Sequence, residues 1–189
     1  MHAVNPLTLP AHQDGLLVVV VETPQGSGNK LKFDPSLGVY RLDRTLPPGM
    51  TFPCDFGFVP QTLGEDGDPL DAVVLLDTPV HPGCIVLARL IGILEVEQQD
   101  GGKGPWVRND RLVAVAGGPN GHSSLHSLGD VDPFRLDAIG AFFEAYHALD
   151  GDKIRLTGKK GIGTATAAIR RAGKAYQRAN AKRSGPASP

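Results

Sequence analysis

Three aspartates stand within six residues in the segment Glu65-Asp66-Gly67-Asp68-Pro69-Leu70-Asp71, just before the apolar run Ala72–Leu76. Like charges this close repel one another, and a bound cation or a shared proton relieves the repulsion. Carboxylate oxygens are the ligands that hard divalent cations such as Mg²⁺ prefer. The alternative is an Asp-rich turn exposed to water; a calcium-binding EF-hand loop is disfavoured by Pro69 and by the missing distal Glu. The pattern favours a metal site.

Basic side chains upstream of this segment are placed to face it, namely Lys30, Lys32, Arg41 and Arg44. A carboxylate metal site beside Lys and Arg suits a substrate with several phosphate groups, because metal ions neutralise some phosphate oxygens and basic side chains bind the others. The alternative is that these are ordinary charged residues of surface strands. For Arg41 we adopt that interpretation.

The segment Thr51–Leu63, which reads TFPCDFGFVPQTL and runs into the D-G-D-P-L-D of Asp66–Asp71, resembles the soluble family I inorganic pyrophosphatases. Their signature is D-G-D-P-x-D after a Y-P-x-N-Y-G-Y/F block. The resemblance extends over roughly residues 16–176 and includes several further matches: Glu22-Thr23-Pro24, Lys30, Arg44 and the late-helix segment Phe142–Tyr146. It implies a small OB-like closed β-barrel of five strands with two helices.

The resemblance also implies an activity, the hydrolysis of inorganic pyrophosphate to two phosphates by metal-activated water, with Mg²⁺ as cofactor and Mn²⁺ as a possible substitute. It assigns Asp66 and Asp71 as metal ligands and Asp68 as the catalytic base. Four residues would bind substrate phosphates: Lys30, Arg44, Arg111 and Tyr146. Further candidates for the site are Glu22, Lys32, Asn109 and His147.

The chain departs from the family pattern within the site. Acids are replaced at Lys32, Gln98, Gln99 and Asn109, which removes about five negative charges and predicts weaker binding of fewer divalent ions. The two signature tyrosines are Phe52 and Phe56, the signature asparagine is Asp55, and a lysine is replaced by His147. An insertion at Asp100–Arg108 leaves four acids as candidates for a displaced ligand: Glu95, Glu97, Asp100 and Asp110.

Two hypotheses therefore stand. The first is an Mg²⁺-dependent inorganic diphosphatase, favoured by the complete D-G-D-P-L-D segment together with Lys30, Arg44 and Tyr146. The second is a divergent pyrophosphatase-like protein with weak or no activity that binds another phosphorylated ligand, favoured by the replaced acids. The number of divalent ions bound with substrate would separate the two.

Short apolar runs separated by Gly, Pro and Asp must position these residues, and they predict strands at Leu16–Glu22, Lys30–Asp34, Val39–Asp43, Ala72–Leu76, Cys84–Val96, Arg111–Val115 and Lys153–Leu156. Apolar residues three or four apart predict a helix over Pro133–Leu149, with Asp132 as N-cap. A second helix is expected from about Thr164 to Ala181, after a basic turn at Gly158–Gly163. The class is mainly β with α (α+β).

The 189 residues, 41% of them hydrophobic, suffice for one domain, predicted at 1–183 with a disordered tail at 184–189. No run approaches the roughly 20 apolar residues that cross a bilayer, so no membrane partner is expected. The N-terminus lacks a basic segment followed by an apolar core, and the two cysteines indicate a reducing compartment; we expect a cytoplasmic protein.

Charge is divided unevenly along the chain. Residues 1–152 hold 20 acids and 9 bases, whereas residues 153–189 hold 10 bases and no acid. A basic segment can bind nucleic acid, but only Tyr176 lies among these charges to stack on a base, so we expect a solvated helix face and no nucleic-acid partner. The family resemblance implies a homo-oligomer, a hexamer in bacterial members.

Overall fold

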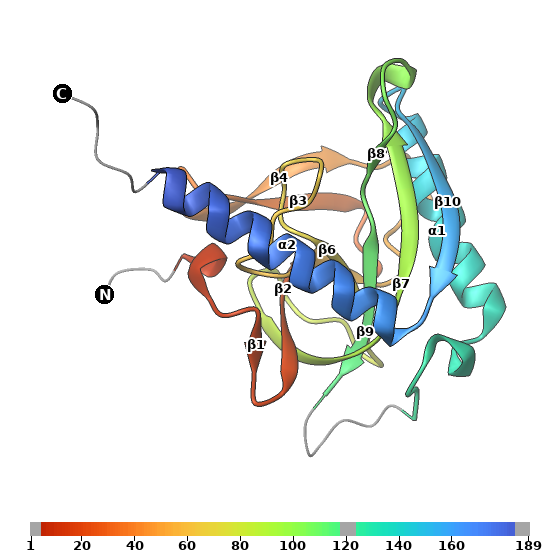
Figure 1. Cartoon of the computed structure of the whole chain (residues 1–189). Coiled ribbons are helices and arrows are strands. Elements are labelled where there is room, and N and C mark those ends of the chain that lie inside the picture. The colour runs from red at the N-terminus through yellow and green to blue at the C-terminus, as the bar shows by residue number, and fades with distance from the viewer. Residues whose placement is uncertain (1–4, 118–123, 184–189) are drawn as a thin grey trace.

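The computed structural model describes residues 5–117 and 124–183, so the predicted tail at 184–189 lies outside the described residues. Five strands form a closed hydrogen-bonded ring in the order β2 (Leu16–Thr23), β5 (Asp55–Phe58), β6 (Asp71–Leu75), β9 (Arg111–Ala116) and β7 (Ile85–Gln99), and β7 pairs back with β2 (Figure 1). This closed ring and the two α-helices confirm the predicted mainly β class with two helices.

Because strand directions cannot alternate around a ring with an odd number of members, at least one neighbouring pair must be parallel. That pair is β6 and β9, and the other four pairings are antiparallel. The register sets Asp71 opposite Arg111, the first residue of each strand. A carboxylate and a guanidinium thus start the two strands at the same end of the ring.

The pleat of these two strands decides which way that pair points. Successive side chains alternate between the faces of a sheet. Ala72 and Val74 pack in the core beneath α2 (Ile162–Arg183), whereas Val73 and Leu75 pack in the core beneath α1 (Pro133–Ala148). Asp71 is in phase with Val73, so its carboxylate lies on the α1 side.

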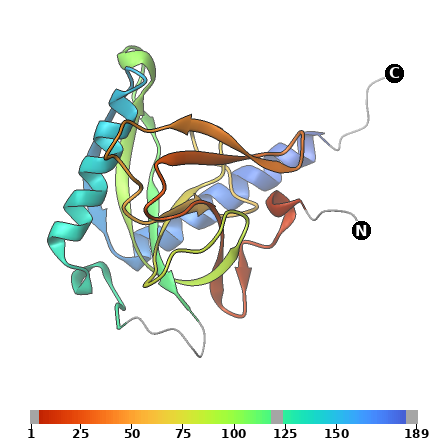
Figure 2. The same ribbon diagram turned by 180° about the vertical axis from the view of Figure 1, so that it is seen from behind.

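Helix α1 begins as predicted: the side chain of Asp132 accepts a hydrogen bond from the Phe134 N–H at 2.9 Å, and Pro133 occupies the first helical position. Its predicted apolar face is buried, through Leu136, Ile139, Phe143 and Tyr146. Helix α2 lies across another side of the strands, in front in Figure 1 and behind in Figure 2. It packs on the ring through Ala165, Ala168 and Ile169.

A separate two-stranded sheet, β3 (Asn29–Asp34) and β4 (Val39–Thr45), is held to the end of β2 by side chains. The Thr23 hydroxyl donates to the Leu31 carbonyl at 3.1 Å and accepts from the Leu31 N–H at 3.0 Å. A Glu22 oxygen accepts from the Phe33 N–H at 2.7 Å. These bonds orient β3 so that Lys30 and Lys32, two residues apart, face the same way.

The remaining elements are β1 (His12–Gln13), β8 (Val107–Arg108), β10 (Lys153–Lys160) and the 3₁₀ turns Pro6–Thr8, Asp100–Gly102 and Leu128–Asp130. The predicted basic turn at Gly158–Gly163 is wrong, because residues 158–160 continue β10 and pair with β7, and α2 begins at Ile162. The 15-residue β7 is long enough to give them partners. Strand β5 was not among the predicted strands.

Candidate active site

A cavity of about 520 Å³ opens between β2, β3, the loop before β6 and the C-terminal end of α1. Ten of the eleven residues predicted for the site line it: Glu22, Lys30, Lys32, Asp66, Asp68, Asp71, Asn109, Arg111, Tyr146 and His147. The eleventh, Arg44, lies next to the cavity but does not line it. Residues spread over 126 positions of the sequence (22 to 147) therefore meet in one place.

The aspartate-rich segment forms a tight turn at the cavity rim. The Gly64 N–H donates to the Asp68 carbonyl at 2.7 Å, and the Asp68 N–H donates to the Asp66 carboxylate at 3.1 Å. Gly67 sits at φ 91°, a conformation that other residues rarely adopt. Loss of solvent and, next, the Asp71 charge raise the pKa of Asp66 to about 6. The turn thus holds Asp66 where its ionised form is disfavoured, first by the loss of water and next by the Asp71 charge.

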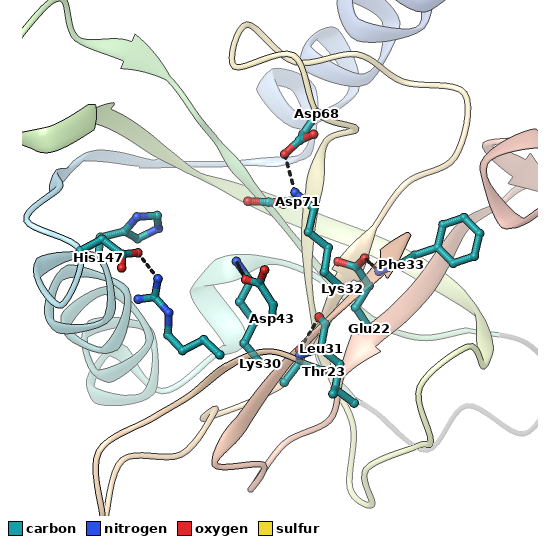
Figure 3. Close-up of polar contacts among 12 residues, drawn as sticks. Glu22, Thr23, Lys30, Leu31, Lys32, Phe33, Asp43, Asp68, Asp71 and His147 are labelled. Carbon is teal, nitrogen blue, oxygen red and sulfur yellow. Dashed lines mark hydrogen bonds and ion pairs between the residues drawn. The ribbon is translucent and has the colours of Figure 1, made fainter. Parts of the chain in front are cut away.

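Basic side chains contact two of these acids. Lys32 Nζ lies 2.9 Å from Asp68 Oδ2, and Arg111 Nη2 lies 3.3 Å from Asp71 Oδ2. Figure 3 shows Lys32 reaching toward Asp68 beside Asp71. Burial raises the pKa of Asp71, although the Arg111 charge acts in the opposite direction. The cavity therefore carries both the acids of a metal site and the bases of an anion site.

Tyr146 links two further cations to the cavity. The Lys30 ammonium is 5.2 Å and the Arg44 guanidinium 5.1 Å from the centre of its ring. Arg44 also pairs with Asp150 in the turn after α1. Its Nη1 is buried and has no hydrogen-bond partner within residues 5–117 and 124–183. A donor without a partner beside the cavity suits an incoming oxygen ligand.

Arg111 is buried, only 2% exposed, at the floor of the cavity. Its Nη1 donates to the Asn109 carbonyl, and its Nη2 lies 3.4 Å from His147 Nε2. Burial and the Arg111 charge lower the pKa of His147 to about 3, so the imidazole is neutral at pH 7. The 3.9 Å approach of His147 to Asp152 is consequently not an ion pair. A neutral ring nitrogen facing Arg111 can accept its hydrogen bond.

The insertion contributes one wall of the cavity. Asp100 and Val107 line it, and Gln98 accepts a hydrogen bond from the Asn109 side chain at 2.8 Å. Of the four predicted displaced ligands, only Asp100 lines the cavity. The others are paired elsewhere: Glu95 and Asp110 contact Arg108 at 2.7 and 2.5 Å, and Glu97 contacts Arg155 at 2.6 Å.

The altered signature positions have structural partners. Phe52 and Phe56 line the cavity but are also members of the core beneath α1. Asp55 is fully buried and accepts hydrogen bonds from the Gln25 and Val80 N–H groups at 2.7 and 3.0 Å, so it joins two loops. Sequence reasoning did not find Asp150 and Asp152, and no local motif marks them.

The donor set fits a divalent cation that shares its coordination with substrate. Among the described residues no three His, Cys, Asp or Glu side chains already converge on one point. Mg²⁺, however, is commonly held by one or two carboxylates and completes its shell with water and substrate phosphates. Asp66 and Asp71 supply two such carboxylates on the cavity, and their raised pKa values indicate negative charge that a cation would stabilise.

Comparisons with known proteins agree with this geometry. The family model described as inorganic pyrophosphatase matches residues 19–177. The inorganic pyrophosphatase of Nostoc sp. is 38% identical over 170 residues, which are 89% of this chain and 97% of the relative. The crystal structure of the Thermus thermophilus inorganic pyrophosphatase superposes with a TM-score of 0.83 at 35% identity and covers 92% of this chain and 99% of that one. The Helicobacter pylori enzyme gives 0.79 at 34% identity, covering 90% and 99%.

Proposed function

Since this chain belongs to the inorganic pyrophosphatase family, we propose that the cavity is where it hydrolyses inorganic pyrophosphate to two phosphates. One observation carries the assignment: three aspartates and three basic side chains, Lys30, Lys32 and Arg111, line the same cavity. The enzyme is a diphosphatase, and its family is metal-dependent. The alternative of a binding protein without activity finds no support among the relatives.

Asp66 and Asp71 would hold the divalent cation, which we propose to be Mg²⁺, with Mn²⁺ as a substitute. A cation bound there would neutralise phosphate oxygens and lower the pKa of the attacking water. Asp71 starts a strand in a fixed register, and Asp66 is held by the Asp68 N–H, so the two carboxylates are positioned before any ion arrives.

Four side chains are proposed to hold the phosphates. Lys30 and Arg44 both flank Tyr146, whose hydroxyl is a further donor, and Arg111 supplies a buried positive charge at the floor of the cavity. Oriented donors aimed at phosphate oxygens stabilise the charge that develops as the anhydride bond breaks. Glu22, Asn109 and His147 complete the lining, and His147, being neutral, adds no charge of its own.

Asp68 is proposed to accept the proton of the attacking water. Replacing Asp68 with Asn keeps the shape of the side chain but removes the base, and should lower phosphate release from pyrophosphate by about 10²-fold or more. Release is measured with Mg²⁺ and then Mn²⁺. The matched control is Asp137→Asn, a change of equal charge on the exposed part of α1, where Asp137 pairs with Lys159. Equal rates for the Asp68 variant and the unaltered chain would contradict the assignment.

We also propose a cytoplasmic homo-oligomer, a hexamer by analogy with bacterial relatives. Cys54 and Cys84 are both unpaired, which suits a reducing compartment. Exposed apolar side chains on the β3–β4 sheet, Leu37, Val39 and Leu42, suit a contact between copies. No helix in the described part of the chain is long and apolar enough to cross a membrane.

A further inference from the structure

Lys32 is the cavity cation whose position suits a change of partner. It extends from β3 across the cavity and forms an ion pair with Asp68 at 2.9 Å (Figure 3), its one ion pair within residues 5–117 and 124–183. The two side chains are 43% and 59% exposed. An ion pair this exposed contributes little to stability, because water screens the two charges and both side chains lose conformational freedom. Lys32 can therefore leave Asp68 at little cost.

The other two lining cations are held more firmly. The Arg111 side chain is 2% exposed, pairs with Asp71 and donates to the Asn109 carbonyl, so moving it would leave a buried charge without partners. Lys30 lies over the Tyr146 ring and forms an ion pair at 3.6 Å with Asp43 on the neighbouring strand β4. The Lys32 side chain, two residues further along β3, is 43% exposed, against 21% for Lys30.

We propose that Lys32 is a substrate-binding residue whose ammonium moves from Asp68 to a pyrophosphate oxygen, so that the cleft binds pyrophosphate before any divalent cation is present. The inference rests on the proposed function. A phosphate oxygen of a multiply charged anion is a stronger acceptor than a screened carboxylate, which makes the exchange favourable. The same movement frees Asp68 Oδ2, so arrival of substrate uncovers the group assigned as base.

A binding measurement without metal tests this. Sodium pyrophosphate is titrated into the full-length protein in EDTA by isothermal calorimetry, where no hydrolysis occurs. The unaltered chain should bind, and Lys32→Met should bind about 10-fold more weakly or worse, the loss expected for one charge-assisted hydrogen bond. Lys32→Arg keeps the charge and should stay within a few-fold of the unaltered chain.

Arg41→Met is the matched control. Arg41 is the register partner of Lys32 on β4 and carries the same charge. It pairs with Asp34 at 3.5 Å, and neither residue lines the cavity. Its loss should leave pyrophosphate binding unchanged. Equal weakening by the Arg41 and Lys32 variants would reduce the effect to net charge and overturn the proposal, as would unchanged binding by Lys32→Met with its melting temperature intact.

A second variant tests the number of metal ions bound. Lys32→Glu adds a carboxylate where the ammonium lies, so with imidodiphosphate bound it should take up at least one more Mn²⁺ per chain than the unaltered protein, counted by electron paramagnetic resonance. An unchanged count would overturn the proposal that the Lys32 ammonium, and not a metal ion, binds the pyrophosphate oxygen at this position. Failure of the proposed function would give a different result, because the unaltered chain would then release no phosphate from pyrophosphate with either Mg²⁺ or Mn²⁺.

Discussion

Two of the acidic side chains in the cavity are paired with basic side chains before any ligand binds. Lys32 offsets Asp68 and Arg111 offsets Asp71, at 2.9 and 3.3 Å. In the described part of the chain Glu22 forms no such ion pair: it is 8% exposed and accepts one hydrogen bond, from the Phe33 N–H. Burial raises its pKa to about 7. Its ionised form is therefore the unfavourable one in the metal-free protein.

Glu22→Gln should stabilise the metal-free protein above pH 7. The folded state holds the Glu22 proton up to about pH 7 and the unfolded state releases it near 4.5, so Glu22 costs stability as pH rises through that interval. Gln keeps an acceptor for Phe33 and does not titrate. Thermal unfolding in EDTA should show a gain of up to about 3 kcal/mol above pH 7 and none at pH 4.5 or below. A gain that does not vary with pH would contradict this account.

At the same scale, sequence reasoning found the side chains with a local signal and missed those without one. Asp66, Asp68 and Asp71 are marked by their mutual spacing, and Lys30 by its place in the resemblance. Asp150, which pairs with Arg44, has no such signal, because its role arises only where the turn after α1 meets β4. The ion pairs of Glu95 and Asp110 with Arg108 likewise have no signal in the sequence. These pairs hold two of the candidate ligands outside the cavity.

At the scale of elements, the helices and strands whose buried residues recur at a regular spacing could be predicted. The buried positions of α1 follow from spacing alone, and β7 differs from its prediction only at its ends. Strand β5 was missed because four residues, Asp55–Phe58, are too short to show a period and include a glycine. Pairing with β2 and β6 makes it a strand, and that pairing is tertiary information.

Gly57→Ala should disrupt this strand. A Cβ on Gly57 would lie 1.9 Å from the Val20 carbonyl oxygen, so β2 and β5 could not keep their register. We expect a loss of about 3 kcal/mol or more, at the upper end of overpacking effects, measured by urea unfolding. Gly163→Ala is the control: it lies in the first turn of α2 with nothing within 4 Å of the added Cβ, and should be neutral or stabilising. Equal stability of the two variants would refute the close approach.

At the scale of the whole molecule, the ring and the two helices bring acids from β2 and the loop before β6 to bases from β3 and β9. The site therefore forms only when the ring of strands is closed. Its residues could be predicted because the family resemblance identified long-range neighbours, which local sequence patterns do not. The charge imbalance between residues 1–152 and 153–189 does not reach the cavity, because all cavity-lining residues precede residue 153. The expectation that the chain binds no nucleic acid stays a prediction.

Mg²⁺ should stabilise the whole fold, and the stabilisation should weaken on acidification. A ligand that binds only the folded state adds about 2.7 kcal/mol at 100 times its dissociation constant. Asp66 must be ionised to hold the ion, and its pKa of about 6 means that protons displace the metal as pH falls through 6. Melting temperatures with and without Mg²⁺ should therefore differ more at pH 7.5 than at pH 5, where protonation of Asp66 weakens the binding. The Asp66→Asn variant should show no Mg²⁺ effect at either pH.

The parallel pairing of β6 with β9 has a consequence for how the enzyme becomes active during folding. Asp71 and Arg111 are 40 positions apart, and the chain between them forms β7, which pairs with β2, β9 and β10. Parallel partners cannot be joined by a hairpin, so this pairing waits for long-range contacts that form slowly. Catalytic activity should therefore return with the slowest kinetic phase of refolding, after most secondary structure has formed, and each turnover in a refolding mixture marks a chain whose ring has closed.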